Sequence, residues 1–361
     1  MQLGIIGLPQ SGKTTLFNAL TRGDQPVTMS GGRFDVHTGI VDVPDERVDR
    51  LSAMFKPQKT IYAKATYVDI AGLEGGTDKS GEAKAFSGAL LNRLAQMDGF
   101  IHVVRCFENA SVAHPSGSVD AQRDMDAIDM EFVLNDLIMV ERKLERMREE
   151  HGKQGGREKD KLAKEIELFD RLHGTLSEEK PLRTLEFSLD EARNIASFGF
   201  LTLKPVLMVL NLGEGQAAPK VNPMFLSGSS VVDLQGKLEM ELAQMPPEDA
   251  AVFMQEYGIE ELSLSRVIGL SYDLLSIQSF FTVGEDEVRA WTVRRGASAV
   301  EAAGAIHTDL QKGFIRAEVV SYEDLVTLGS MAKARDHGKL RLEGKTYIVQ
   351  DGDIVHIRFN L

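Results

Sequence analysis

Cysteine is nearly absent from this sequence. Among its 361 residues there is one, Cys106, and a single cysteine forms no disulfide within the chain. Chains without disulfides are typical of a reducing cytosol. Cys106 lies inside an apolar stretch, which favours a buried small hydrophobic side chain over a nucleophile. We therefore expect neither a disulfide framework nor thiol chemistry.

Long hydrophobic runs are also missing. No apolar stretch approaches the ~18–20 residues that a membrane-spanning helix needs. The N-terminus leads directly into the strand-like LGIIG, without a basic region followed by a cleavable apolar segment. We expect no membrane association and, together with the scarcity of cysteine, a cytoplasmic protein.

Positive charge is in deficit. Forty-one Lys and Arg face 54 Asp and Glu, for a net charge of −13. This balance argues against a uniformly basic nucleic-acid-binding protein, and we expect no DNA partner. Contact with RNA through one small basic face stays open. Near the C-terminus, Lys333, Arg335, Lys339 and Arg341 are candidates for that face, although most such runs are solvated surface.

Short apolar runs are present throughout the first 230 residues. Runs of this kind are typical of strands buried on both faces of a parallel sheet, and helix-like segments such as 13–22 and 83–97 lie between them. Strands alternating with helices predict a doubly wound α/β domain. The runs are LGIIG (3–7), TYVDIAG (66–72), FIHVVRCF (100–107), PVLMVLNL (205–212) and the shorter MFLSG (224–228).

Residues 120–180 interrupt this alternation. Apolar residues recur there at spacings of four and three, in two series separated by the glycine-rich GKQGGRE. The pattern predicts an antiparallel helical hairpin inserted at about 121–180, which would contact a partner protein. The alternative is a pair of amphipathic helices lying flat on the main domain. The two series are Val133, Leu137, Val140, Leu144 and Met147, then Leu162, Ile166, Phe169, Leu172 and Leu176.

After residue 275 the pattern changes to short strands with tight turns. EVRAWTV (287–293), FIRAEVV (314–320), KLRLEG (339–344) and KTYIVQDGDIVHIRF (345–359) are strand-like. A helix is expected after Ser298, ending near Gly313. We predict a nucleotide-binding domain over 1–275 and a small α+β domain over 276–361, on the scale of a ubiquitin-like fold.

The segment GLPQSGKT, from Gly7 to Thr14, matches the phosphate-binding pattern G-x-x-x-x-G-K-[ST]. Backbone N–H groups of such a loop surround phosphate oxygens at a helix N-terminus. Lys13 would reach the terminal phosphates, and the Thr14 hydroxyl is a hard oxygen ligand suited to Mg²⁺. The alternative, a chance match in a glycine-rich turn, fits poorly with its position between a strand and a helix.

Asp69 and Gly72 close a second strand in the sequence DIAG. The aspartate can hold Mg²⁺ through water, and Gly72 can offer its N–H to a γ-phosphate, so Lys13, Asp69 and Gly72 are the predicted catalytic residues. Alone, D-x-x-G is often an ordinary strand-ending turn. The next residue is Leu73, which cannot orient a water as the glutamine of Ras-like proteins does. We therefore expect slow intrinsic hydrolysis.

Residues 211–214, NLGE, follow the strand after which guanine-nucleotide proteins carry Asn-Lys-x-Asp. Asn211 can tie this loop to the phosphate loop, but Leu212 replaces the lysine and Glu214 is one methylene longer than the aspartate. Selection of guanine needs a placed carboxylate, so selectivity against adenine should shrink. Ser227, Gly228 and Ser229 can complete the base pocket. The alternative is an ordinary Asn/Gly turn.

Taken together, these segments resemble the YchF subfamily of Obg-related P-loop nucleotide hydrolases, nearly end to end. Distinctive stretches are GLPQSGKTTLFNAL, VDIAGL, HVVRCFE, NLGE and the terminal LEGKTYIVQDGDIVHIRFN. The resemblance implies a G domain with an inserted helical hairpin and a C-terminal TGS (β-grasp) domain. It also implies hydrolysis of ATP in preference to GTP, dependence on Mg²⁺, and association with the ribosome or its RNA.

The resemblance also carries over residue roles. It assigns the magnesium hydroxyl to Thr14, while Asp69 is the second predicted metal ligand. The predicted nucleotide-binding residues lie in the phosphate loop, the base loop and the turn after the following strand. They are Gly7, Gln10, Ser11, Gly12, Lys13, Thr14, Thr15, Asn211, Leu212, Glu214, Ser227, Gly228 and Ser229.

Two positions depart from the family pattern. Gln10 stands where the family has an asparagine that, in related proteins, helps to bind a monovalent cation, and this argues against potassium activation. Arg33 stands where the first switch has a magnesium-binding threonine, and Thr38 matches a different family position. Either the loop shifts to bring in another hydroxyl, or the switch closes differently, or Arg33 contacts a phosphate directly as a hypothetical internal charge clamp.

Three functions compete at this point. The first is an ATPase whose nucleotide state controls association with ribosomes or RNA. The second is a nucleotide-binding regulatory module with negligible hydrolysis, which Leu73 and the altered first switch favour. The third, a P-loop kinase for a small molecule, fits poorly, since base-loop and switch motifs replace an arginine-rich lid.

Overall fold

The computed structural model describes residues 1–23, 36–70, 87–152, 156–221, 231–256, 259 and 262–360. The chain forms two compact units. The first contains Met1–Gly39 and Tyr67–Leu264, and the second contains Ile40–Thr66 and Ser265–Leu361. None of the described helices is both long and apolar enough to cross a membrane.

The first unit is built on a six-stranded sheet with strand order β2-β4-β1-β5-β6-β7. The apolar runs of the sequence form its central strands, and β1, β5, β6 and β7 pair in parallel. This is the doubly wound α/β arrangement that the sequence predicted. The strands are β1 (Gln2–Ile6), β2 (Val36–Asp42), β4 (Lys64–Ile70), β5 (Gly99–Arg105), β6 (Val206–Asn211) and β7 (Val231–Leu234).

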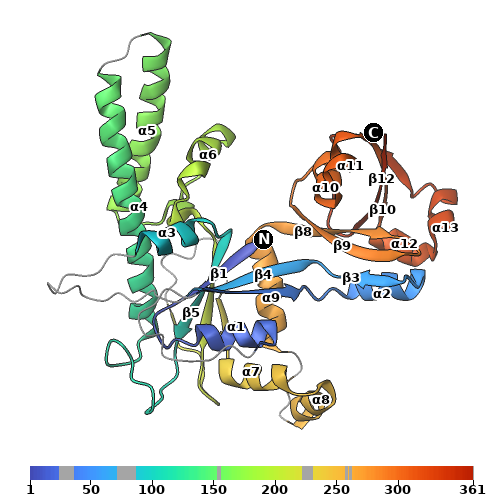
Figure 1. Ribbon diagram of the computed structural model, residues 1–361, viewed down its shortest axis with the longest axis horizontal. Helices are drawn as coiled ribbons and strands as arrows, with labels where there is room; N and C mark the ends of the chain where they lie inside the picture. Colours follow the sequence, from blue (N-terminus) through green and yellow to red (C-terminus); the bar gives the residue numbers. More distant parts are fainter. Residues whose placement is uncertain are drawn as a thin grey trace. The chain divides into compact units, whose positions relative to one another are not determined.

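Helices cover this sheet because its strands are apolar on both faces. On β5, Phe100 and Val104 pack with the first half of α4 and with α3, while Ile101 and Val103 are buried on the opposite face. α1 and α7 pack against each other (Figure 1). The helices of this unit are α1 (Lys13–Thr21), α3 (Gly88–Ala95), α4 (Ala121–His151), α5 (Arg157–Ser177), α6 (Leu189–Ile195), α7 (Gly236–Gln244) and α8 (Pro247–Glu256), while α9 (Ser263–Leu274) begins at the end of this unit and belongs mostly to the second.

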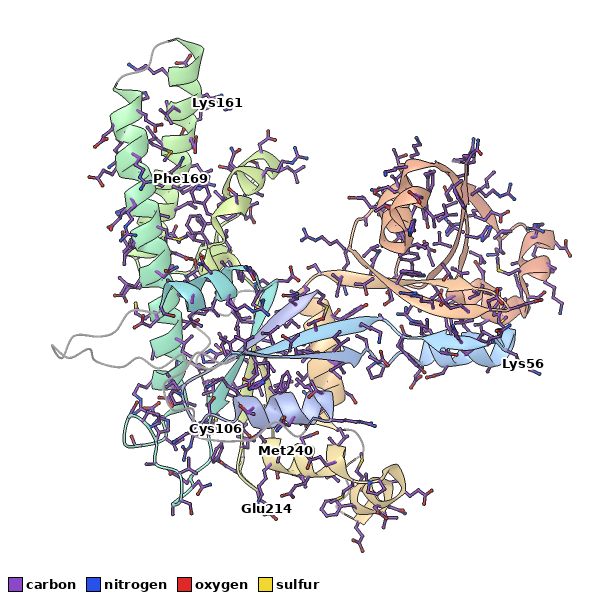
Figure 2. The ribbon with its side chains drawn as sticks, viewed as in Figure 1. Lys56, Cys106, Lys161, Phe169, Glu214 and Met240 are labelled. Carbon is purple, nitrogen blue, oxygen red and sulfur yellow. The ribbon has the colours of Figure 1, made fainter. Side chains whose placement is uncertain are left out.

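Helices α4 and α5 form the predicted antiparallel hairpin. α4 begins after Asp120, whose side chain accepts a hydrogen bond from the Arg123 N–H. The two helices stand out from the sheet rather than lying flat on it (Figure 1). The predicted seam is buried between them except at Leu137 and Ile166, which are partly buried, and Phe169 lies at its centre (Figure 2). The projecting hairpin is therefore confirmed.

The base of the hairpin is fixed by one buried carboxylate. Asp136 accepts hydrogen bonds from the Leu201 N–H at 3.1 Å, the Thr202 N–H at 2.8 Å and the Thr202 hydroxyl at 2.6 Å. These bonds tie α4 to a 3₁₀ turn, Leu201–Leu203, immediately before β6. Other 3₁₀ turns are Leu182–Thr184 and Ala196–Phe198.

The second unit contains a mixed sheet of order β11-β10-β12-β8-β9-β3. Antiparallel pairs β8–β9 and β10–β12 meet through the parallel pair β12–β8, and α10 packs on one face. This is the ubiquitin-like arrangement that the sequence predicted. The elements are β3 (Lys59–Ile61), β8 (Ile277–Val283), β9 (Glu287–Arg294), β10 (Phe314–Ser321), β11 (Arg341–Glu343), β12 (Asp353–Phe359), α2 (Glu46–Phe55), α10 (Ala299–Ile306), α11 (Thr308–Lys312), α12 (Tyr322–Leu328) and α13 (Met331–Asp336).

Details of this unit differ from the sequence expectation. The helix begins after Ser298 as expected, with Ser298 and Glu301 forming a capping box, but it breaks at His307 into α10 and α11. Strand β8 lies outside the segments read as strands. The sequence analysis placed residues 40–66 in the first domain, whereas in the structure they belong to the second unit. There β3 pairs with β9 in parallel, with Lys59 opposite Glu287.

Candidate phosphate and base loops

The phosphate-binding loop connects β1 to α1. Gly12 caps α1 in a left-handed conformation with φ 98°, which favours glycine. A Cβ on Gly12 would lie 2.2 Å from Asn211 Nδ2, and one on Gly7 would lie 2.3 Å from the Val103 carbonyl oxygen. Both motif glycines are therefore required for the loop to pass this close to its neighbours.

Lys13 crosses this loop. Its ammonium donates hydrogen bonds to the carbonyl oxygens of Gly7 and Leu8, each at 2.8 Å. Beside it, Gln10 Oε1 and Ser11 Oγ are buried side-chain atoms without a hydrogen-bond partner among the described residues. Gln10 has a positive φ of 62°, unusual for a residue other than glycine or asparagine. The Lys13 ammonium and the unsatisfied side-chain oxygens of Gln10 and Ser11 therefore lie together in the loop at the N-terminus of α1.

Thr14 and Asp69 form the predicted metal pair. The Thr14 hydroxyl donates to Asp69 Oδ2 at 2.8 Å, and the other carboxylate oxygen, Oδ1, is buried with no hydrogen-bond partner among the described residues. Burial raises the pKa of Asp69, while the Thr14 hydrogen bond and the charges of Lys13 and His37 act in the opposite direction. A hydroxyl beside an unsatisfied carboxylate oxygen is a donor set that fits Mg²⁺.

Asn211 joins the base loop to the phosphate loop. Its side-chain Nδ2 donates to the Ser11 carbonyl oxygen at 2.9 Å, and its Oδ1 accepts from the Gly236 N–H at 3.0 Å. The asparagine is 4% exposed, so both bonds are shielded from water. One amide thus connects the strand ends of β6 and β7 to the loop after β1.

In the rest of the base loop, the Leu212 side chain is buried and the Glu214 side chain is exposed to solvent. The Leu212 side chain is buried in the core that includes β5 and α4, so only its backbone faces the loop. Glu214 is exposed and lies away from the core (Figure 2). Gln216, which the sequence analysis missed, accepts from the Gly213 N–H at 2.9 Å and donates to the Cys106 carbonyl oxygen at 2.7 Å.

The structure places the phosphate-loop residues, Asp69 and Asn211 around the ends of β1, β4 and β6. Thr15 is half-buried in the first turn of α1. Several predicted residues lie outside the described residues, and their roles stay predictions: Arg33, Gly72, Leu73, Ser227, Gly228 and Ser229.

Other titratable residues of the first unit have different environments. Cys106 is buried, and burial with the nearby charge of Asp124 raises its pKa to about 12, consistent with an inert thiol. His102 is buried on β5. His114 Nε2 lies 2.8 Å from Asp124 Oδ2, and both side chains are nearly inaccessible. Within the described ranges no three His, Cys, Asp or Glu residues gather as a metal site.

Comparison with known proteins identifies relatives that are nucleotide hydrolases, which is consistent with the phosphate-binding and base loops described above. Residues 2–143 match the family described as "50S ribosome-binding GTPase", and residues 277–360 match the YchF-GTPase_C family, described as a protein of unknown function (DUF933). A "Ribosome-binding ATPase YchF" from Bacillus subtilis (strain 168) is 39% identical, with 99% of each chain covered. Its counterpart from Haemophilus influenzae is 40% identical over the same shares.

A solved structure also matches along the whole chain. The "Structure of the Schizosaccharomyces pombe YchF GTPase" superposes with a TM-score of 0.85 at 31% sequence identity, covering 99% of this chain and 97% of the other. The similarity therefore extends over the phosphate loop, the hairpin and the second unit together.

Proposed function

This chain belongs to the YchF family, and on that premise we propose that it is a P-loop nucleoside triphosphatase that prefers ATP to GTP. It binds the nucleotide with Mg²⁺, and its nucleotide state controls association with the ribosome. The observation that carries the proposal is the convergence of Lys13, Thr14, Asp69 and Asn211 around one loop.

The phosphate loop supports binding of a triphosphate. Lys13 already holds two carbonyl oxygens of the loop, and phosphate oxygens are stronger acceptors for an ammonium. Transfer of Lys13 to the terminal phosphates would place its charge where negative charge gathers in the transition state. Backbone N–H groups at the start of α1 add to this field.

Thr14 and Asp69 are the residues that would hold Mg²⁺. When bound, the ion neutralises charge on the phosphate oxygens and aligns them. The role of this chain is to offer the Thr14 hydroxyl and the unsatisfied Asp69 oxygen on two rigid elements, α1 and β4. Gln10 in place of the family asparagine supports a turnover with little potassium dependence.

The base loop supports a preference for ATP. A carboxylate that selects guanine must be held against the base, because selectivity comes from buried polar pairing. Glu214 is exposed, and the adjacent Gly213 N–H is already bonded to Gln216. The loop is nevertheless well fixed, through Asn211, as a functional base loop requires.

Association with the ribosome is supported by the names of the relatives, each a ribosome-binding ATPase. The C-terminal basic run contributes less than its sequence suggests. Arg335 pairs with Glu318, Lys339 with Asp324, and Arg341 with Glu343. These ion pairs reduce the positive potential available to RNA on this TGS-like unit.

Turnover of matched Thr14 variants tests the proposal. Thr14→Ala removes the hydroxyl and should raise the Mg²⁺ concentration needed and lower turnover by about 10–100-fold. Thr14→Ser keeps the hydroxyl and should retain most activity. A wild-type rate that stays at background with ribosomes and K⁺ present would instead favour the regulatory module with negligible hydrolysis.

A further inference from the structure

Arg105, the last residue of β5, is a buried cation. It is 2% exposed and forms no ion pair with any residue that the structure describes. Its Nε donates to the Phe107 carbonyl oxygen at 3.1 Å, and its Nη2 donates to the Val112 carbonyl oxygen at 2.8 Å. The guanidinium also lies 4.7 Å from the centre of the Phe107 ring. One side chain thus holds both ends of residues 107–112, the 107–112 segment.

For the stability of the fold alone, this arginine is a poor choice. A buried charge is costly when no opposite charge lies beside it. The third nitrogen of Arg105, Nη1, is in addition a buried donor without a hydrogen-bond partner among the described residues. The arrangement instead suits a side chain that fixes one conformation of a segment, because the planar guanidinium presents its donors in a rigid fork.

The base loop contacts the residues that Arg105 fixes. Gln216 donates to the Cys106 carbonyl oxygen at 2.7 Å and accepts from the Gly213 N–H at 2.9 Å. Phe107 lies beside the same glycine, since a Cβ added to Gly213 would be 3.5 Å from the Phe107 Cβ. The conformation of the base loop therefore depends on where the end of β5 and Phe107 are held.

We propose that Arg105 is a positioning residue for nucleotide binding, and that it acts on the base rather than on the phosphates. It fixes the 107–112 segment, and through Phe107 this segment holds Gly213 of the base loop. The inference rests on the proposed binding of ATP and specifies how the affinity for its base is set.

The phosphate loop is fixed independently of this arginine. Lys13 donates to the Gly7 carbonyl oxygen at 2.8 Å, and the Asn211 amide donates to the Ser11 carbonyl oxygen at 2.9 Å. Neither bond involves the segment that the arginine holds. A change at Arg105 should therefore weaken binding of ligands that carry a base and spare ligands that consist of phosphate alone.

Calorimetry of the full chain with ATP and with inorganic tripolyphosphate, each with Mg²⁺, tests this separation. Arg105→Lys keeps the charge but removes the planar fork over the Phe107 ring. ATP binding should weaken about fivefold, while tripolyphosphate binding should stay within about twofold of wild type. Steady-state turnover should show a raised KM for ATP and an unchanged kcat, because the lost interaction is made equally in the ground state and the transition state.

Arg183→Lys is the matched control. Arg183 is also a buried arginine of the first unit, but it lies at the base of the hairpin beside Asp129. The substitution should leave the binding of both ligands as in wild type, so a general effect of losing a buried guanidinium is distinguished from an effect on the base loop.

A second measurement uses the wild-type protein and does not depend on the folding of a variant. Hydrogen exchange of amides in the 107–112 segment should slow when ATP is bound, because the base loop then holds the segment from its other side. Tripolyphosphate should change this exchange little. Equal slowing by the two ligands would overturn the base-specific role.

The outcomes separate this inference from the proposed function. Wild type that binds neither ATP nor tripolyphosphate would overturn nucleotide binding and the inference with it. If wild type binds ATP but Arg105→Lys binds it equally well, only the inference is overturned. The same holds if Arg105→Lys weakens the binding of ATP and tripolyphosphate to the same extent, since that result would show a purely structural role.

Discussion

At the scale of single residues, the amide of Asn211 holds the candidate nucleotide site together. It bonds the Ser11 carbonyl on one side and the Gly236 N–H on the other, both away from water. Sequence pattern predicted this role, because an asparagine after a buried strand is a local signal. The sequence pattern could not identify Gly236 as the second hydrogen-bond partner of Asn211, because Gly236 is not part of any recognisable motif.

Asn211→Ala should weaken nucleotide binding strongly. The change leaves the Ser11 carbonyl and the Gly236 N–H buried without partners, at a cost of about 1–3 kcal/mol each. We expect calorimetry to show at least about tenfold weaker binding of ATP. Gln216→Ala, which alters only the outer part of the loop, should have a smaller effect. Equal losses in the two variants would contradict the bridging role.

His102 should make the first unit sensitive to acid. Burial, with the positive charges of Lys13 and Arg183, lowers its pKa from 6.5 to about 3. Between these values the unfolded chain binds a proton that the folded chain does not, so stability falls as pH falls. From pH 7 to pH 4 the loss is about 3 kcal/mol.

His102→Leu should remove most of this dependence. Leucine suits the position because the cross-strand neighbours, Ile6 and Met208, are apolar. Urea unfolding at pH 7 and pH 4 should show a smaller difference than in wild type. His356→Gln, at an exposed histidine of β12, should leave the wild-type difference unchanged. A His102→Leu protein as acid-sensitive as wild type would show that other groups dominate.

At the scale of elements, the hairpin has a core of its own. Phe169 is fully buried and lies 5.1 Å from the Phe198 ring, centroid to centroid. Its neighbours belong to the cluster formed by α4, α5 and the turns before β6, separate from the core under the phosphate loop. The hairpin and the nucleotide site should therefore respond differently to the same mutation.

Phe169→Ala should destabilise the hairpin by about 3–5 kcal/mol, as cavities of this size do. Hydrogen exchange of α4 and α5 amides should become faster, while affinity for ATP changes little. Leu189→Ala, at an exposed position of α6, should leave exchange in the hairpin unchanged. Loss of nucleotide binding in the Phe169 variant would show that the two regions fold as one.

Element prediction succeeded where the signal was local. The buried strands β1, β5 and β6 appear as continuous apolar runs, and the hairpin seam appears at spacings of four and three. Strand β3 has three residues, two of them exposed, and pairs with a strand far along the chain. No local pattern marks such a strand, because its partner rather than its own sequence determines its structure.

At the scale of the whole molecule, residues 40–66 join the segment after residue 264 in one unit. Arg47 of α2 donates to Asp351, 304 residues away, at 2.7 Å, and its guanidinium lies over the Phe281 ring. The second unit is therefore completed by an excursion of the chain between β2 and β4. Composition shifts along the sequence could not indicate this, since they mark boundaries but not partners.

Arg47→Ala should loosen the second unit by about 1–2 kcal/mol, through loss of charge-assisted hydrogen bonds and the ring contact. Hydrogen exchange in β8 and β12 should increase in the intact chain. Arg50→Ala, at an exposed position of the same helix, is the control and should exchange like wild type. Unchanged exchange in the Arg47 variant would contradict a structural role for this excursion.

The central claim is that the loop NLGE reads the base without selecting guanine. Side-by-side calorimetry of ATP and GTP binding to the intact protein, at equal Mg²⁺, tests it most directly. We expect ATP to bind more tightly, because Glu214 is exposed and is therefore not held as a carboxylate that would favour guanine. Clearly tighter binding of GTP would contradict the account.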